Sequence, residues 1–350
     1  MDTIDIKHYT VSELRSWLEH NIAPEGLTNE VIRPSFAWAL IHHPDVLEDD
    51  PIVAALFDHG QLAASTCAFP EIMVKPEFLD EHGQPKRVWW FPMLWCKPEY
   101  RGKGYGLVVI GSLAEVYGTD SAWTAWAVQE SIEIFEFLGC KTYYFPRYFM
   151  GEKTINANSF KGKLAFMKQG CQKWWHSHNM PALPRYDYAL RYLNNVDDES
   201  YDFICQHCTE NFFHSSQGVL NWLIQYPWNI SAPLEKRVPK NGTYFAEITP
   251  LILFSFVQVW SKGQLVGVYR LRQNENRLTC DFIYYDKASA EIVFASVVEH
   301  ILSMKATHFD TEDGNLAAFV RKYIYFQKCT TEQLSLSIAP TILVPEHFVR

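Results

Sequence analysis

The chain has 350 residues, of which 48% are hydrophobic and 20% charged, and its formal net charge is −9. A chain of this length can hold two domains of ordinary size, and its composition is that of a globular protein with a core rather than of a disordered one. The negative charge argues against general nucleic-acid binding, which needs a basic face, but it is compatible with one cationic pocket for a single anion.

No part of the sequence has the pattern of a targeting or membrane-spanning segment. The N-terminal residues contain no basic patch followed by an apolar run, so no secretory signal is predicted. No apolar stretch approaches the roughly 20 residues that a membrane span needs. The eight cysteines are scattered, and in a chain this long they are expected to be reduced thiols. We therefore expect a cytoplasmic protein with no membrane partner.

The first half of the chain predicts a mixture of helices and strands. Apolar residues at helical spacing predict helices at 11–20 and 29–43, and Pro34 suits a first turn, so the regular part of the second helix is expected to start near it. Gly60 in a short polar turn predicts a β-hairpin between strands at 52–57 and 62–69. The other elements expected in this half are a strand at 88–96, a helix at 107–117, a strand at 122–128, a helix at 130–138, and strands at 140–150 and 186–193.

The strand predicted at 88–96 contains a proline. The run is apolar enough for a central strand, yet Pro92 cannot donate a ladder hydrogen bond. Proline within a strand is found at bulges or edges. A bulge or a splay of the sheet near Pro92 is therefore expected.

The second half repeats the first in the same order. Trp38 to Pro44 matches Trp222 to Pro227 at the end of a helix, and the turn sequence HGQL at 59–62 returns as KGQL at 262–265. The polar stretch 194–200 between the halves predicts a domain boundary. The later elements expected are a strand at 278–285, a helix at 289–304, a strand near 308, a helix at 315–323 and a strand at 334–338.

The sequence RGKGYG at 101–106 lies between a predicted strand and a predicted helix. Its glycines let the backbone turn tightly and expose N–H groups, and the helix that follows offers further N–H groups and the positive end of its dipole. Arg101 and Lys103 add cations, so the loop predicts a pyrophosphate cradle. The spacing fits neither a P-loop nor the dinucleotide fingerprint. In the second half Asp286 to Ala288 stand in its place, which predicts a copy without the anion site.

Two motifs resemble those of the GNAT superfamily of N-acyltransferases. Residues 98–106 resemble its acyl-CoA loop, and Ile134 to Cys140 resembles its second signature. The order of elements from 10 to 193 is similar to that of the family, and the second half is similar to its skeleton. The resemblance implies an α/β fold (a mixed α+β sheet) made of two tandem GNAT-like domains, the second degenerate.

On this resemblance, domain 1–195 binds acyl-CoA and domain 196–350 contributes to the acceptor site. The loop N–H groups would hold the CoA pyrophosphate, and the end of the preceding strand would pair with the pantetheine arm at the splay. No metal is expected. The implied cofactor-binding residues are Leu94, Trp95, Cys96, Arg101, Gly102, Lys103, Gly104, Tyr105 and Gly106.

Direct acyl transfer to an amine needs a general base that makes the amine neutral. Members of the superfamily often protonate the departing thiolate with a tyrosine of the second signature, but Phe135 stands at that position. A thiol pKa of about 8.5 lets the CoA thiolate leave unassisted. The candidate bases are Glu71, His176 and His178, and a structural role is the alternative for each.

The acceptor is expected to be a small-molecule primary amine. Tandem proteins of this size resemble bacterial enzymes that acylate nucleotide-linked amino-deoxysugars for surface polysaccharides, and the 12 Trp and 18 Tyr residues offer rings on which a base could stack. Two alternatives stay open. The acceptor could be an amino acid, peptide or polyamine, whose ammonium could be held by Asp310, Glu312 and Asp313, or the protein could be a non-catalytic acyl-CoA-binding module.

Overall fold

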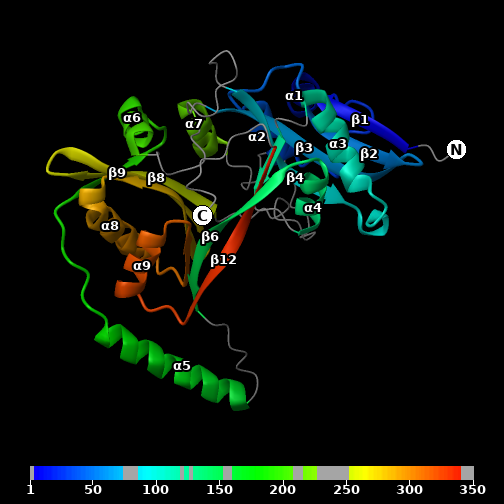
Figure 1. The fold of residues 1–350 in the computed structure, drawn as a ribbon. Coiled ribbons are helices and arrows are strands. Elements are labelled where there is room, and N and C mark those ends of the chain that lie inside the picture. Colours follow the sequence, from blue (N-terminus) through cyan, green and yellow to red (C-terminus); the bar gives the residue numbers. More distant parts are fainter. Residues whose placement is uncertain are drawn as a thin grey trace. The chain divides into compact units, whose positions relative to one another are not determined.

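The computed structural model forms two compact units of chain. Unit 1 comprises 1–145, 210–250 and 334–350, and unit 2 comprises 146–209 and 251–333. These units divide the chain at other residues than the predicted domains 1–195 and 196–350, and the role assigned to each predicted domain stays a prediction. The residues that the structure describes are 4–73, 86–118, 122–125, 129–152, 160–207, 216–226 and 252–339 (Figure 1).

Residues 4–151 contain the helices and strands expected there, preceded by a strand that was not expected. The strand expected in the first half at 186–193 is found at 189–193, but it is the first strand of the second copy. The second predicted helix begins at Pro34, because the fixed φ of proline suits a first turn. Residues 126–128 of the strand predicted at 122–128 lie outside the described residues. The elements are β1 (Ile4–Thr10), α1 (Val11–His20), α2 (Pro34–Ile41), β2 (Pro51–Asp58), β3 (Gln61–Met73), β4 (Lys86–Cys96), η2 (Pro98–Tyr100), α3 (Tyr105–Tyr117), β5 (Ala122–Ala125), α4 (Gln129–Phe137) and β6 (Lys141–Gly151).

The second half repeats this order element by element, which confirms the predicted repeat. Its elements are β7 (Ala189–Leu193), α6 (Asp198–His207), α7 (Gln217–Gln225), β8 (Ile252–Ser261), β9 (Gln264–Asn274), β10 (Arg277–Tyr285), η6 (Lys287–Ser289), α8 (Ala290–Ser303), β11 (His308–Thr311), α9 (Gly314–Tyr323) and β12 (Lys328–Ile338). Helix α5 (Phe160–Asn179) lies between the two halves in the chain, in a segment for which neither a helix nor a strand was predicted. Among the described residues, no helix is both long and apolar enough to span a membrane.

The hairpin turns of the two halves share one backbone conformation. His59 and Gly60 have φ of 51° and 76°, and Lys262 and Gly263 have φ of 51° and 77°. Two successive residues with positive φ form the type of two-residue turn whose backbone twist matches the twist of the two strands that it joins. The short sequence echo at these turns therefore reflects a structural equivalence.

Each half supplies its last strand to the other half's sheet. In unit 1 the strands follow the order β1-β2-β3-β4-β5-β12, and Leu336–Ile338 of β12 run antiparallel to β5. In unit 2 the order is β6-β11-β10-β9-β8-β7, and Tyr148–Gly151 of β6 run antiparallel to β11. The repeat is thus a pair of copies that exchange strands, and the two units cannot be separated by one cut in the chain.

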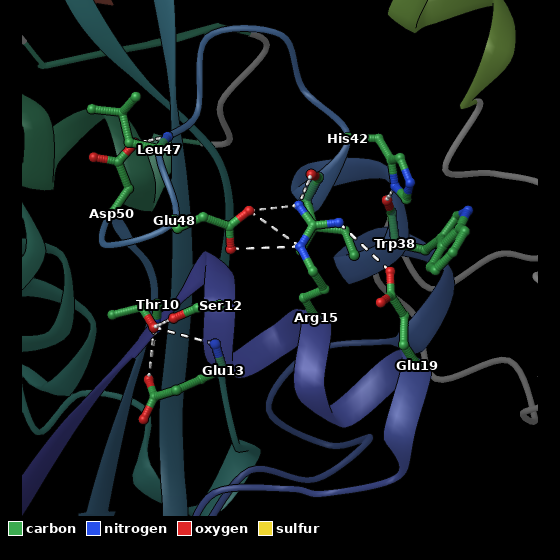
Figure 2. Close-up of polar contacts among 11 residues, drawn as sticks. Thr10, Ser12, Glu13, Arg15, Glu19, Trp38, His42, Leu47, Glu48 and Asp50 are labelled. Carbon is green, nitrogen blue, oxygen red and sulfur yellow. Dashed lines mark hydrogen bonds and ion pairs between the residues drawn. The ribbon is translucent and has the colours of Figure 1, made fainter.

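Polar contacts hold the first helix at its N-terminus and at its middle (Figure 2). The Glu13 N–H donates to the Thr10 hydroxyl at 3.3 Å, and the Thr10 N–H donates to the Glu13 carboxylate at 2.8 Å, which forms a capping box. Arg15 donates to the Glu48 carboxylate at 3.0 Å and to the Ile41 carbonyl at 3.2 Å. These bonds attach α1 to α2 and to the segment before β2.

Helix α7 belongs to the second half by sequence, yet it packs on α2 in unit 1. The Trp222 indole N–H donates to the Ala39 carbonyl at 2.6 Å. Its ring meets that of His43 edge-on at 4.6 Å between centroids, and Tyr226 stacks on His42 at 4.4 Å. The two helices that match in sequence are therefore in contact in the fold.

His43 is buried in this contact, with 3% of its surface exposed. Its Nδ1 accepts a hydrogen bond from the Asp45 N–H at 3.2 Å, so Nε2 carries the proton of the neutral ring. Among the described residues, Nε2 has no hydrogen-bond partner. Burial, and to a smaller extent the charge of Arg87, lower the pKa of His43 to about 3.

This histidine makes the unfolding free energy depend on pH. The folded protein keeps His43 neutral, whereas the unfolded chain protonates it below its ordinary pKa of 6.5. Its contribution is therefore present above pH 6.5 and is lost as the pH falls. Between pH 7 and pH 5 we expect the wild type to lose about 2 kcal/mol more stability than His43→Phe, measured by urea unfolding. The same loss in both proteins would contradict a neutral buried His43.

Candidate functional site

Strand β4 carries a bulge where the sequence predicted one. β3 and β4 run antiparallel, and their register shifts between the pairs Cys67–Met93 and Phe69–Trp90. One extra residue of β4 is accommodated there, at Pro92. A β-bulge disrupts the ladder locally and bends the strand, which removes the need for the N–H that proline lacks.

Past the bulge, the described part of β5 does not accompany β4. The two strands pair in parallel at Trp89 and Trp90, and next along the strand the Thr124 hydroxyl donates to the Phe91 carbonyl at 2.9 Å. β5 ends at Ala125, while β4 continues for several residues. Within the described residues, the end of β4 therefore has a neighbouring strand on one edge alone, that of β3.

The free edge of β4 is formed by alternate residues. The Lys97 N–H donates to the Ala63 carbonyl at 2.9 Å and so points to β3. Because successive residues of a strand direct their backbone groups to opposite edges, Leu94 and Cys96 direct theirs away from β3. The Cys96 carbonyl accepts a bond from Arg101 Nε at 3.3 Å. The backbone N–H and carbonyl of Leu94 are thus placed to pair with an extended ligand chain.

The loop after β4 has the open conformation that its glycines predict. Gly102 and Gly104 both have φ of 79°, in the left-handed region, and a Cβ added to either would meet nothing within 4 Å. Gly104 is the N-cap of α3 and has no side chain that could satisfy the N–H groups of the first turn. The exposed start of this helix is therefore suited to an anion.

Gly106 has a different role, which is close packing. A Cβ there would lie 3.3 Å from Leu94 Cδ2 and 3.4 Å from Ile134 Cδ1. The first turn of α3 consequently rests on the end of β4 and on α4. Glycine at this position brings the helix N-terminus next to the free strand edge.

Asp58, at the end of β2, anchors the loop. The Tyr105 hydroxyl donates to the Asp58 carboxylate at 2.9 Å, and Lys103 Nζ lies 3.9 Å from the same oxygen. Asp58 is 8% exposed, whereas Lys103 is half exposed and its Nζ lies 4.8 Å from the centre of the Tyr100 ring. The Asp58 carboxylate therefore orients the Tyr105 ring and the Lys103 ammonium.

The nine predicted cofactor-binding residues come together in unit 1, on the end of β4 and the following loop. Asp58 and Thr124 belong to the same region, and sequence reasoning did not identify them. No local signal marks either residue, because their partners Tyr105 and Phe91 lie far away in the sequence. Whether any of these residues binds CoA stays a prediction.

The second copy keeps the skeleton and lacks the loop, as predicted. Its β10 has a register shift between Cys280 and Phe282, which matches the bulge of β4. After β10, the Asp286 carboxylate accepts bonds from the Ala288 N–H at 3.1 Å and the Ser289 hydroxyl at 3.4 Å. A negative charge already stands where the first copy exposes glycine N–H groups, so an anion is disfavoured there.

The predicted bases fall in different units. Glu71 lies on β3 in unit 1, 5% exposed and opposite Val88, two residues from the pair that begins the bulge. His178 lies on α5 in unit 2, exposed, with Nδ1 2.8 Å from the Trp174 carbonyl. His176 lies on the same helix, and its side chain is outside the described part of the chain. All three assignments stay predictions.

Comparison with known proteins identifies the fold. No protein-family model and no curated protein sequence matches the chain. A GCN5-related N-acetyltransferase from Kribbella flavida has a TM-score of 0.51 and 12% identity, and the match covers 96% of this chain and 71% of that one. Another from Anabaena variabilis has a TM-score of 0.53 and 9% identity, covering 95% and 72%. The chain therefore has the GNAT fold, present in two tandem copies of which the second is degenerate.

Substitution of one loop glycine tests the anion site. Gly104→Trp fills the open space at the start of α3, so we expect CoA affinity to fall at least about tenfold in isothermal titration calorimetry. Gly263→Trp is the matched control, because Gly263 also has positive φ and open surroundings but lies in the hairpin of the second copy. Wild-type CoA affinity in Gly104→Trp would refute the loop as the binding site.

Proposed function

We propose that the protein is an N-acyltransferase that moves an acyl group from acyl-CoA to a primary amine. The observation that carries this proposal is that an open glycine loop with two cations, at the start of α3, lies against the end of β4 in unit 1. Backbone N–H groups at a helix start bind a pyrophosphate, and an extended chain with amide groups binds a strand edge by adding to the sheet. CoA carries a pyrophosphate and two amide groups in one molecule.

The proposal gives each predicted residue a defined task. The backbone from Arg101 to Gly106 holds the pyrophosphate, and Arg101 and Lys103 supply positive charge. Leu94 pairs with the pantetheine arm through its backbone, flanked by Trp95 and Cys96. Gly106 sets the spacing between these two parts, because it holds the helix start against Leu94. The likeness in fold to GCN5-related N-acetyltransferases supports the assignment.

The reaction is direct attack of a neutral amine on the thioester carbonyl. The new C–N bond forms, the C–S bond breaks, the amine loses a proton to a base, and the CoA thiolate leaves. With a thiol pKa of about 8.5 the thiolate needs no acid, which is consistent with Phe135 in place of a tyrosine. We favour Glu71 as the base, because it lies in unit 1 near the bulge. His176 and His178 are the alternatives.

For the acceptor we propose the amino group of a nucleotide-linked amino-deoxysugar, on the grounds of the resemblance and the many aromatic residues. One observation disfavours the polyamine alternative. The acidic residues of unit 2 are already engaged, since Arg147 forms ion pairs with Asp310 and with Glu312, the latter at 3.5 Å. Asp313 accepts a bond from the Leu316 N–H at 2.7 Å as the cap of α9. Each of these three carboxylates thus already has a partner within unit 2.

A thiol-release assay tests the activity. Purified protein is given acetyl-CoA or longer acyl-CoAs with a panel of nucleotide-linked amino sugars, amino acids, peptides and polyamines, and we expect turnover with the amino sugars. Absence of turnover with every acceptor, despite CoA binding, would favour the non-catalytic module.

A pair of variants then identifies the base. We expect Glu71→Gln to lower kcat by at least about 100-fold with little change in the KM for acyl-CoA, since general bases contribute about 10²–10⁴-fold. His178→Asn should keep the wild-type kcat. If His178→Asn lowered kcat and Glu71→Gln did not, His178 on α5 would be the base instead of Glu71.

A further inference from the structure

Helix α5 is the one described element without a counterpart in the repeat. Every other helix and strand of the first half has an equivalent in the second half. Neither copy of the fold therefore needs α5 for its own sheet. In Figure 1 the helix runs clear of α8 and α9, the other helices of unit 2 that the figure labels near it.

Four large apolar side chains of α5 among the described residues are exposed. Leu164, Met167, Trp174 and Trp175 have exposed fractions of 51, 66, 60 and 62%, and the exposed Cys171 lies between them. Along the sequence these five residues are separated by three, four, three and one positions, so at 3.6 residues per turn they form one stripe along the helix. We call this set of five residues the apolar stripe.

A polar residue on another face of α5 contacts the rest of unit 2. Gln169 is half-buried, and its side-chain amide donates to the Gln327 side chain. At 100° per residue, position 169 lies roughly opposite the centre of the apolar stripe. The helix thus turns a polar side chain inward and its stripe outward, the reverse of a helix that packs on a core.

The borders of the apolar stripe are basic. The helix contains four lysines and neither Asp nor Glu, in a chain with a net charge of −9. Lys163 directly precedes Leu164, Lys168 directly follows Met167, and both lysines are exposed. An apolar stripe with Trp residues and bordering lysines is what an interfacial helix presents to a bilayer, with rings at headgroup level and ammonium groups on anionic lipids.

We propose that α5 binds the surface of an anionic lipid bilayer, with the apolar stripe inserted to the boundary of the acyl chains. A second copy of the chain fits this helix less well. Two stripes facing each other would bring like-charged lysine borders together, and four apolar side chains present less than the about 800 Å² per partner of a standard interface. This proposal departs from the sequence-based expectation of no membrane partner.

Sedimentation with vesicles tests this proposal on the full chain. Wild-type protein should sediment with vesicles made of equal parts phosphatidylglycerol and phosphatidylcholine at low salt, and should stay in solution with phosphatidylcholine alone. Met167→Asp/Trp175→Asp should lower the partition coefficient at least about tenfold, because it places two charges in the stripe. Lys163→Glu/Lys168→Glu should do the same, since each lysine near an anionic surface contributes about 1 kcal/mol.

The matched control is Leu302→Asp on α8. Leu302 is 54% exposed, so the change adds one negative charge at an exposed apolar residue of unit 2 outside α5 and should leave vesicle binding unchanged. Circular dichroism verifies that each variant is folded. Equal binding by the wild type and Met167→Asp/Trp175→Asp would overturn the proposal.

Failure of the wild type to sediment with the anionic vesicles would also overturn it. Sedimentation velocity then identifies the other occupant. A dimer that Trp175→Asp dissociates would assign the apolar stripe to a second copy of the chain.

Discussion

The candidate site depends on the close packing of Gly106 on Leu94, at the end of β4 beyond its bulge. Beyond the bulge at Pro92, the alternation of β4 directs the backbone of Leu94 away from β3. The missing side chain at position 106 lets the first turn of α3 rest on that strand end. A helix start that attracts anions and a strand edge that accepts an extended chain are thereby neighbours. With a larger residue at 106, each part would persist but the two would no longer be joined at the spacing of one ligand.

The two copies of the fold differ at the candidate site, because the first copy alone has the glycine loop after its fourth strand. Both copies keep the hairpin turn, the bulge and the 3₁₀ turn after the fourth strand, because these features belong to the sheet of each copy. The anion loop is not required by the sheet, and in the second copy Asp286 occupies that place with a carboxylate. Helix α7 shows that the halves also share helices, since Trp222 completes the packing of α2 in unit 1.

Features with a local signal were predictable from the sequence, and features made by distant residues were not. The glycine loop, the proline bulge, the hairpin turns and the repeat each follow from residues that are close together in the chain. The edge strand β1 was missed because most of its side chains are partly or fully exposed and give no apolar pattern. The Asp58–Tyr105 bond, the packing of α7 in unit 1 and the outward stripe of α5 depend on contacts or exposure that only the fold determines.

The stoichiometry of CoA binding tests the central claim most directly. If the loop at 101–106 is the one anion-binding loop of the tandem fold, calorimetric titration of the full chain with CoA should give one site per chain. Replacing Asp286 with alanine should leave that number unchanged, because the second copy also lacks the glycines. Two sites per chain, or no binding by the wild type, would contradict the account.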